Sequence, residues 1–329
     1  MEAPSTLASP DGSAPVPRGR RWYTHRFNTP LSWELILRVT PKLPRVVLVP
    51  LHHLTTTLCF LCFYRERAAS RRNLRRITGK TGFAGLAVTY RLFYNFSRFM
   101  VGYAGLRGAR LDQFRDRLDG LEETDRALSA LIREGNGVII ATLHMGHWDL
   151  GLKLLSAYEI PTHVVMAQTD PAEVTRYAAE ARDNPTLRPH HLGAPMLGVE
   201  LMLALKRGEL VALQTDRSAG PGEMPVSFFG GTVPLPSGPV ELAIATGAPI
   251  LPIFILFGRK DRFRILSSEP LRFERGAGRR DPAERQRAMQ QVAAMMESII
   301  SRYPDQWFSF YDFWKNSPDP SGAQEGSHA

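Results

Sequence analysis

Residues 137–151 read Gly-Val-Ile-Ile-Ala-Thr-Leu-His-Met-Gly-His-Trp-Asp-Leu-Gly, and this stretch decides the fold. Its first half consists of small and β-branched apolar residues, which predicts a buried strand. A polar tip carrying His144, His147 and Asp149 follows, and the apolar spacing of residues 150–155 then predicts a helix. Because α/β folds place their chemistry at the carboxyl ends of such strands, we expect the functional site at this tip.

Four residues separate His144 from Asp149, a spacing that suits acid–base chemistry. If the tip turns directly into a helix, the Asp149 carboxylate accepts the Nδ1 proton of His144 and leaves Nε2 as a general base. Such a base deprotonates a hydroxyl or amine that attacks an acyl carbonyl. His147 competes for the base role, although it lies only two residues from the aspartate. The alternative for both histidines is a structural role, with ordinary hydrogen bonds at the strand end.

The 329 residues suffice for one large domain, or for a domain with an appendage. The net charge is +9, with 41 Lys and Arg against 32 Asp and Glu. A basic balance fits an anionic membrane surface, nucleic acid, or anionic substrates such as acyl-CoA. No zinc-ligand spacing and no nucleic-acid-binding motif accompanies this charge, so we expect no nucleic-acid partner.

Residues 46–63 are the only candidate for a membrane segment in the sequence. A span needs about 20 apolar residues, whereas this run is shorter, contains a proline and two histidines, and precedes an arginine-rich segment. We predict an interfacial or shallowly inserted helix; the alternative is an ordinary buried helix. Cys59 and Cys62 lie in this run, and we interpret them as buried or membrane-facing thiols rather than a redox or metal pair.

The alternation of strand-like and helix-like segments predicts an α/β fold with a mostly parallel central sheet flanked by helices, preceded by a membrane-associating helical segment. We expect a disordered leader at 1–25, the membrane-associating segment at 26–80, the α/β domain at 81–315 and a disordered tail at 316–329. The expected strands are 137–143, 161–167, 210–214, 249–257, 262–266 and 270–273, and the expected helices are 85–106, 125–134, 172–183, 196–206, 240–246 and 282–303.

Three blocks of the sequence resemble, in order, those of the lysophospholipid acyltransferase superfamily. The first is the stretch with His144 and Asp149, and the second is Lys-Arg-Gly-Glu-Leu-Val-Ala-Leu-Gln-Thr-Asp-Arg at 206–217. The third runs from Val-Ser-Phe-Phe-Gly at 226–230 to Ala-Thr-Gly-Ala-Pro-Ile-Leu-Pro at 245–252. The resemblance is closest to the branch of the bacterial lipid A late acyltransferases and the mycobacterial phosphatidylinositol-mannoside acyltransferase.

This resemblance implies a bacterial enzyme on the cytoplasmic face of the inner membrane. It implies transfer of a fatty acyl group from acyl-CoA or acyl carrier protein to a hydroxyl or amine of a lipid or glycolipid, with His144 and Asp149 as the catalytic pair. The sequence shows no Ser nucleophile elbow and no catalytic Cys pattern, which fits direct transfer without an acyl-enzyme. We expect no metal or cofactor. The helix at 85–106 is interpreted as either a wall of an acyl-chain tunnel or a helix packed on the sheet.

Two further candidates come from the residues that end the strand at 210–214. Asp216 and Arg217 are expected to border the same cleft as His144, where Arg217 binds a phosphate or a developing oxyanion, or forms a structural ion pair.

The resemblance supplies the other candidates. It implies a cleft arginine at Arg182, and a second carboxylate partner for the catalytic histidine, for which Glu223 is the candidate. Phe229 and Gly230 are expected to shape a substrate pocket.

Two departures from the family pattern argue against a lipid A acceptor. Asp149 stands where the lipid A enzymes commonly carry glutamate, and residues 306–314 are aromatic and acidic where those enzymes have a Trp with basic neighbours. The alternatives to an acyltransferase are a thioesterase or lipid hydrolase that uses the same His–Asp pair on water, and a lipid-binding protein without catalysis.

Overall fold

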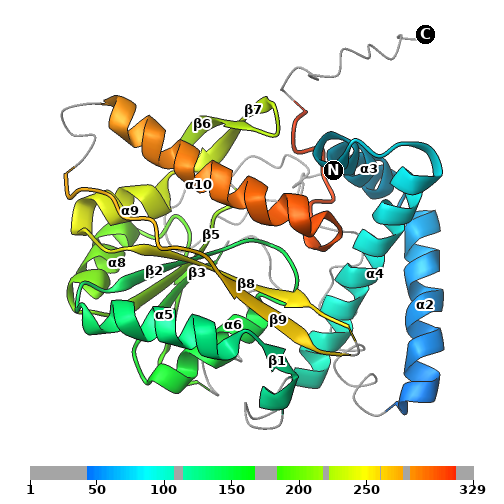
Figure 1. The fold of residues 1–329 in the computed structure, drawn as a ribbon, viewed down its shortest axis with the longest axis horizontal. Coiled ribbons are helices and arrows are strands. Elements are labelled where there is room, and N and C mark those ends of the chain that lie inside the picture. The colour runs from blue at the N-terminus through cyan, green and yellow to red at the C-terminus, as the bar shows by residue number, and fades with distance from the viewer. Residues whose placement is uncertain are drawn as a thin grey trace, which may run out of the picture.

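The structure is a computed structural model, and it describes residues 43–106, 114–166, 184–217, 222–259, 261–276 and 282–315. In this part of the chain a seven-stranded sheet lies between layers of helices, and a two-stranded hairpin stands apart from it (Figure 1). The helices are α2 (Arg45–Cys62), α3 (Tyr64–Thr78), α4 (Gly82–Leu106), α5 (Leu121–Arg133), α6 (Asp149–Leu155), α8 (Leu197–Lys206), α9 (Gly238–Thr246) and α10 (Pro282–Arg302). The strands are β1 (Leu118–Asp119), β2 (Val138–Thr142), β3 (Thr162–Met166), β4 (Leu187–His191), β5 (Leu210–Gln214), β6 (Glu223–Phe228), β7 (Gly231–Pro236), β8 (Ile250–Phe257) and β9 (Phe263–Ser267).

The sheet has the strand order β1-β9-β8-β2-β5-β3-β4. Strands β8, β2, β5, β3 and β4 run parallel, and β9 pairs antiparallel with β8 at one side. The organising strand β2 lies in the middle, between β8 and β5, which explains its continuous apolar sequence because a central parallel strand is covered on both faces. The expected α/β class with a mostly parallel sheet is confirmed.

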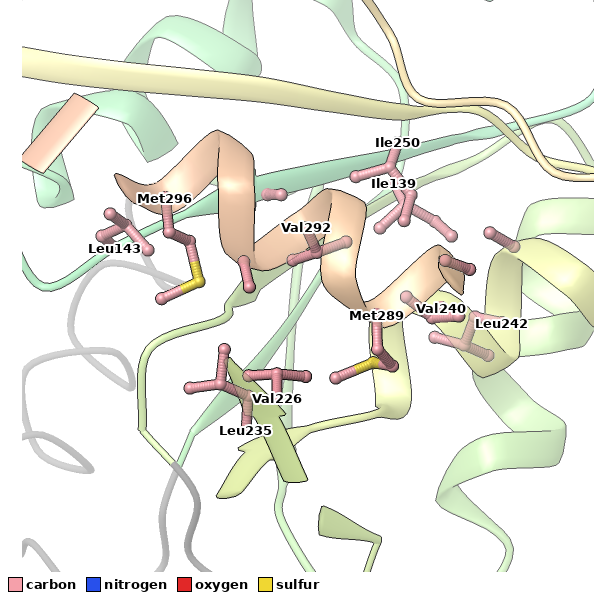
Figure 2. Close-up of a cluster of buried hydrophobic side chains, with 14 of the residues drawn as sticks. Ile139, Leu143, Val226, Leu235, Val240, Leu242, Ile250, Met289, Val292 and Met296 are labelled. Atoms are coloured by element: carbon pink, nitrogen blue, oxygen red, sulfur yellow. The ribbon is translucent and has the colours of Figure 1, made fainter. Parts of the chain in front are cut away.

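One face of the sheet is covered by α8, α9, α10 and the β6–β7 hairpin (Figure 1). In Figure 2, Met289, Val292 and Met296 of α10 lie among the buried side chains of the sheet and of the hairpin. Met296 is fully buried, so its replacement by alanine is expected to cost about 2–5 kcal/mol of folding free energy. This packing ties the hairpin to the sheet through α10.

The opposite face of the sheet is covered by α5 and α6. Here Val138 and Ile140 of β2 join Leu210 and Ala212 of β5 in a second buried cluster, with Leu128 from α5. Alternate residues of a strand point to opposite faces, and for this reason β2 supplies side chains to both clusters. The same alternation determines which residues reach the site described below.

Helices α2, α3 and α4 form a separate layer at one end of the sheet (Figure 1). Helix α4 packs on the carboxyl-terminal segment through edge-to-face aromatic contacts, with Phe96 4.9 Å from Phe310 between ring centroids. Within the described residues no single helix has the length and apolar content to cross a membrane. Helices α2 and α3 meet that criterion only as a pair, and they are bent by 90° at the break between them.

Several expected elements differ in the structure. The expected strand at 270–273 is reduced to a single bridge between Leu271 and Ile250. Strand β4 and the β6–β7 hairpin were not expected; β4 contains a proline and charged residues, and therefore lacks an apolar alternation. The expected helix at 172–183, the leader at 1–25 and the tail at 316–329 lie outside the described residues.

Candidate active site

The loop between β2 and α6 is fixed against β8. Gly146 has φ +57°, and a Cβ at this position would lie 2.1 Å from the carbonyl oxygen of Ile255, so only glycine fits there. The next backbone N–H, that of His147, donates to the same carbonyl at 2.7 Å. The sequence Met-Gly-His therefore holds His144 at a defined place at the carboxyl end of β2.

His144 forms a hydrogen-bonded pair with Asp216, which follows the neighbouring strand β5. His144 Nδ1 lies 2.8 Å from Asp216 Oδ1. The backbone N–H of His144 also donates to this carboxylate, at 3.1 Å and 3.2 Å from its two oxygens. An ionised carboxylate only accepts hydrogen bonds, so Nδ1 carries the proton and Nε2 is the basic nitrogen.

The Asp216 carboxylate is 98% buried, since its residue is 2% exposed. Burial acts to raise its pKa, but His144, Arg217 and the Trp307 indole together hold the pKa below its ordinary value. Trp307 Nε1–H donates to Asp216 Oδ2 at 2.8 Å. The carboxylate is thus ionised and fully oriented toward the imidazole, which is the arrangement that prepares a histidine to act as a general base.

The carboxyl-terminal segment 306–308 joins the two halves of this pair. The backbone N–H of Phe308 donates to the His144 carbonyl at 2.8 Å, and that of Gly146 donates to the Gln306 carbonyl at 2.9 Å. Arg217 Nη2 donates to the Phe308 carbonyl at 2.8 Å. A segment that is more than 90 residues away along the chain therefore fixes both the histidine loop and the strand end that carries Asp216.

The carboxylate contact expected for Asp149 is made by Asp216 instead. The expectation required the tip to enter a helix at once, whereas the chain passes through Gly146 in the left-handed region and α6 begins only at Asp149. Positions five apart are therefore not on one helix face here. Asp149 is buried as the first residue of α6, and its part in catalysis stays a prediction.

His147 is fully buried among aromatic rings, in keeping with the structural alternative for this residue. Its ring lies 5.4–5.9 Å from the rings of Phe99, Phe257 and Phe263. A Cβ on Gly102 of α4 would lie 3.0 Å from His147 Nε2, so the helix approaches this ring closely. His147 helps to join α4 to the sheet.

The other predicted site residues are divided between the site and its surroundings. Arg217 follows Asp216 directly and contributes to its low pKa, as an arginine bordering the cleft should. Glu223 is exposed at the start of β6, and its part as a second carboxylate partner of His144 stays a prediction. Phe229 and Gly230 form the turn of the β6–β7 hairpin, where the Phe229 N–H donates to Glu297. Arg182 lies outside the described residues.

A cavity of about 620 Å³ opens on the α5–α6 face of the sheet, next to the His144 loop. Leucine and isoleucine side chains of α5, α6, β2, β8 and β9 form its walls, and exposed charged residues such as Arg115, Glu122 and Arg126 stand at its outer side. Thr142 and Trp148 line it close to the His144–Asp216 pair, since the Trp148 ring lies 5.4 Å from the His144 ring between centroids. Both its size and its apolar lining are typical of sites for small molecules.

The comparisons with known proteins agree with this geometry. The family model of the bacterial lipid A biosynthesis acyltransferases matches residues 27–316. The chain belongs to this family. The resemblance that the sequence blocks carry is thereby confirmed, and the match extends across the α/β domain and the helical layer α2–α4.

Two curated relatives of this family member carry the name phosphatidylinositol mannoside acyltransferase. That of Mycolicibacterium smegmatis is 29% identical over 205 residues, which cover 57% of this chain and 62% of the relative. That of Mycobacterium tuberculosis strain CDC 1551 is 30% identical over 159 residues, covering 45% of this chain and 46% of the relative. The chain thus spans about half to three fifths of the length of the relatives that it matches.

The sequence did not indicate the part that Trp307 plays. Its surroundings, Gln-Trp-Phe-Ser-Phe, showed aromatic character but no periodicity that would direct one ring to the site. The position of Asp216 at a strand end, by contrast, was visible, because strands β2 and β5 both end in polar residues.

Proposed function

We propose that this protein transfers a fatty acyl group from an acyl thioester to a hydroxyl or amine of a membrane lipid or glycolipid. The observation that carries the proposal is the buried His144–Asp216 pair, which stands beside an apolar cavity at the carboxyl edge of the sheet. The cavity takes the acyl chain, and the pair activates the acceptor. The name of the mycobacterial relatives directs attention to phosphatidylinositol mannosides as acceptors.

The reaction proceeds by direct attack. His144 Nε2 removes the proton from the acceptor hydroxyl while its oxygen bonds to the thioester carbonyl carbon, and Asp216 stabilises the imidazolium that forms. When the tetrahedral intermediate collapses, the carbon–sulfur bond breaks and the imidazolium returns its proton to the thiolate. The products are an ester, or an amide for an amine acceptor, and the free thiol of the donor, either CoA or acyl carrier protein.

We propose that α2 and α3 bring this site to the cytoplasmic surface of the inner membrane. Val46, Leu54, Leu58 and Leu61 of α2 are 51–81% exposed. Helix α3 follows directly with exposed arginines at positions 65, 71, 72 and 75. An exposed apolar helix beside a cationic one suits partial insertion into an anionic bilayer, where the leucines enter the acyl region and the arginines meet the phosphates.

The test of the catalytic proposal measures thiol release from a long-chain acyl-CoA, with and without mannosylated phosphatidylinositol, followed by mass spectrometry of the lipid. We expect release that depends on the acceptor, a product heavier by one acyl group, and loss of both in His144→Ala. The matched control is His163→Ala, a histidine that also contacts a carboxylate but lies elsewhere. Release without any lipid acceptor would indicate a thioesterase, and no release from acyl-CoA or acyl carrier protein would favour a lipid-binding protein.

The test of the membrane proposal is flotation of the protein with vesicles. The double variant Leu54→Glu/Leu58→Glu should bind vesicles of anionic phospholipid much more weakly than the unchanged protein. Leu203→Glu is the control, because Leu203 is also about half exposed but lies on α8. Equal binding of all three proteins would contradict a role for α2.

A further inference from the structure

Paired residues of strands β2 and β5 lead from the cavity to the catalytic pair. The two strands are parallel and in register, with Ile140 opposite Ala212 and Thr142 opposite Gln214. Ile140, Ala212 and Thr142 line the cavity. Two residues beyond the end of each strand come His144 and Asp216, which are hydrogen-bonded to each other.

Gln214 therefore stands between the cavity and the catalytic pair. Because side chains alternate along a strand, Gln214 points to the same face as Leu210 and Ala212, both of which belong to the buried cluster on the α5–α6 side. The neighbouring Leu213 packs into the cluster on the other face, which agrees with this assignment. Gln214 is the last residue of β5 on this face, and Asp216 follows it two residues later.

The Gln214 side chain has a buried hydrogen-bond donor without a partner. Its Nε2 atom is shielded from solvent and forms no hydrogen bond in the described part of the chain. A buried polar group of this kind costs about 1–3 kcal/mol, and such groups are rare in folded proteins. The nearby indole Nε1 of Trp148, which lines the cavity, is also buried and has no hydrogen-bond partner among the described residues.

We infer that Gln214 Nε2 donates a hydrogen bond to the carbonyl oxygen of the acyl thioester. The inference rests on the proposed function, since the acyl chain in the cavity and the base at His144 together place the reacting carbonyl at the level of Thr142 and Gln214. As the acceptor oxygen attacks, negative charge develops on the carbonyl oxygen, and the amide N–H stabilises it. No proton is transferred to the oxyanion. When the intermediate collapses, the electron pair on this oxygen re-forms the carbon–oxygen double bond, and the negative charge leaves with the thiolate.

The principal variant is Gln214→Leu, which keeps a similar size and removes the donor. We expect kcat to fall about 10²–10³-fold, as for other single donors to an oxyanion, while the KM for acyl-CoA changes little. The melting temperature should stay the same or rise, because an unpartnered polar group leaves the protein interior. Gln286→Leu is the matched control; Gln286 lies on the exposed side of α10, where it binds the Pro225 carbonyl of the hairpin.

A binding experiment tests the contact without turnover, so its outcome is independent of whether the proposed reaction is observed. Two unreactive CoA analogues are compared: one with a ketone placed near the sulfur, and a thioether in which a methylene replaces the carbonyl. Gln214→Leu should weaken binding of the ketone about threefold to tenfold, the worth of one neutral hydrogen bond, and leave the thioether unchanged. Equal weakening of both analogues, an unchanged kcat, or a fall in melting temperature that accounts for the lost activity would each overturn the inference.

Discussion

A histidine-bound carboxylate lies near each end of strand β5. The two pairs have the same distance between histidine and carboxylate but differ in their position in the sheet and in their other hydrogen-bond partners. Asp216 follows the strand and lies 2.8 Å from His144; Glu209 precedes it and lies 2.8 Å from His163. Both ring nitrogens of His163 have a close polar partner: Nε2 lies beside Glu209, and Nδ1 lies 2.7 Å from His190 Nε2. Glu209 in addition accepts two hydrogen bonds from Arg207.

The two pairs differ in their position in the sheet and in the groups that offset the negative charge of each carboxylate. The Glu209 pair sits at the amino end of the sheet strands, with a bidentate arginine that neutralises the carboxylate. The Asp216 pair sits at the carboxyl end, beside the apolar cavity, where α/β folds bind their ligands. A distance of 2.8 Å between a histidine and a carboxylate is therefore not a signature of catalysis by itself.

The largest expected effect separates the two pairs by activity. Asp216→Asn keeps the size of the side chain but favours the wrong tautomer of His144, and we expect acyl transfer to fall about 10³-fold or more. Glu209→Gln makes the same chemical change at the other end of β5 and should leave the transfer rate within about twofold, because this pair lies at the opposite end of the strand from His144. Rates of acceptor-dependent thiol release measure both. Comparable losses in the two variants would remove the distinction drawn here.

The next effect concerns the cavity, which lies close to the Asp216 pair because Trp148 lines it and the Trp148 ring lies 5.4 Å from the His144 ring between centroids. Ala212→Leu adds bulk to the cavity wall, and we expect the rate with long acyl chains to fall about tenfold or more relative to short ones. Ala243→Leu is the control, because Ala243 is also buried but lies on α9, on the other face of the sheet. That variant should lower the melting temperature without changing the preference for chain length. An unchanged preference in Ala212→Leu would place the acyl chain elsewhere.

The sequence was informative where local patterns determine structure, and less so where distant segments meet. The alternation of strand-like and helix-like segments was sufficient to predict the mostly parallel sheet, and the polar tip after the apolar run of β2 indicated His144. The partner of His144 depended on the left-handed turn at Gly146 and on the alignment of β2 with β5, neither of which follows from the spacing of His144 and Asp149. Trp307 reaches the site only because of tertiary packing, for which no local signal exists.

A smaller effect tests that tertiary contact. Trp307→Phe keeps the aromatic packing and removes the hydrogen bond to Asp216. Because a hydrogen bond to a charged group contributes about 1.5–3 kcal/mol, we expect activity to fall roughly tenfold, with a modest loss of stability. Trp314→Phe is the matched variant, since the Trp314 indole donates to the Phe228 carbonyl at 2.9 Å, away from the catalytic pair. It should lower stability and spare the rate; a rate loss as large as that of Trp307→Phe would assign both rings to general packing.

The smallest expected difference is in acid stability, where the two carboxylates should behave alike. The pKa of Asp216 is lowered against the opposing effect of burial, and the pKa of Glu209 is lowered chiefly by Arg207. The pKa of a carboxyl in the unfolded chain is about 3.9 for Asp and about 4.3 for Glu. When the pKa in the folded protein is lower, the carboxyl stabilises the fold at pH values above the unfolded pKa. This contribution is lost as the pH falls through the folded pKa. Urea unfolding between pH 7 and pH 3 should therefore show less acid sensitivity in both Asp216→Asn and Glu209→Gln. If acid sensitivity fell in only one of the two variants, the pKa would distinguish the pairs. If it falls in both, a low pKa is common to a structural and a catalytic carboxylate. In that case the position beside the cavity is what assigns the chemistry to Asp216.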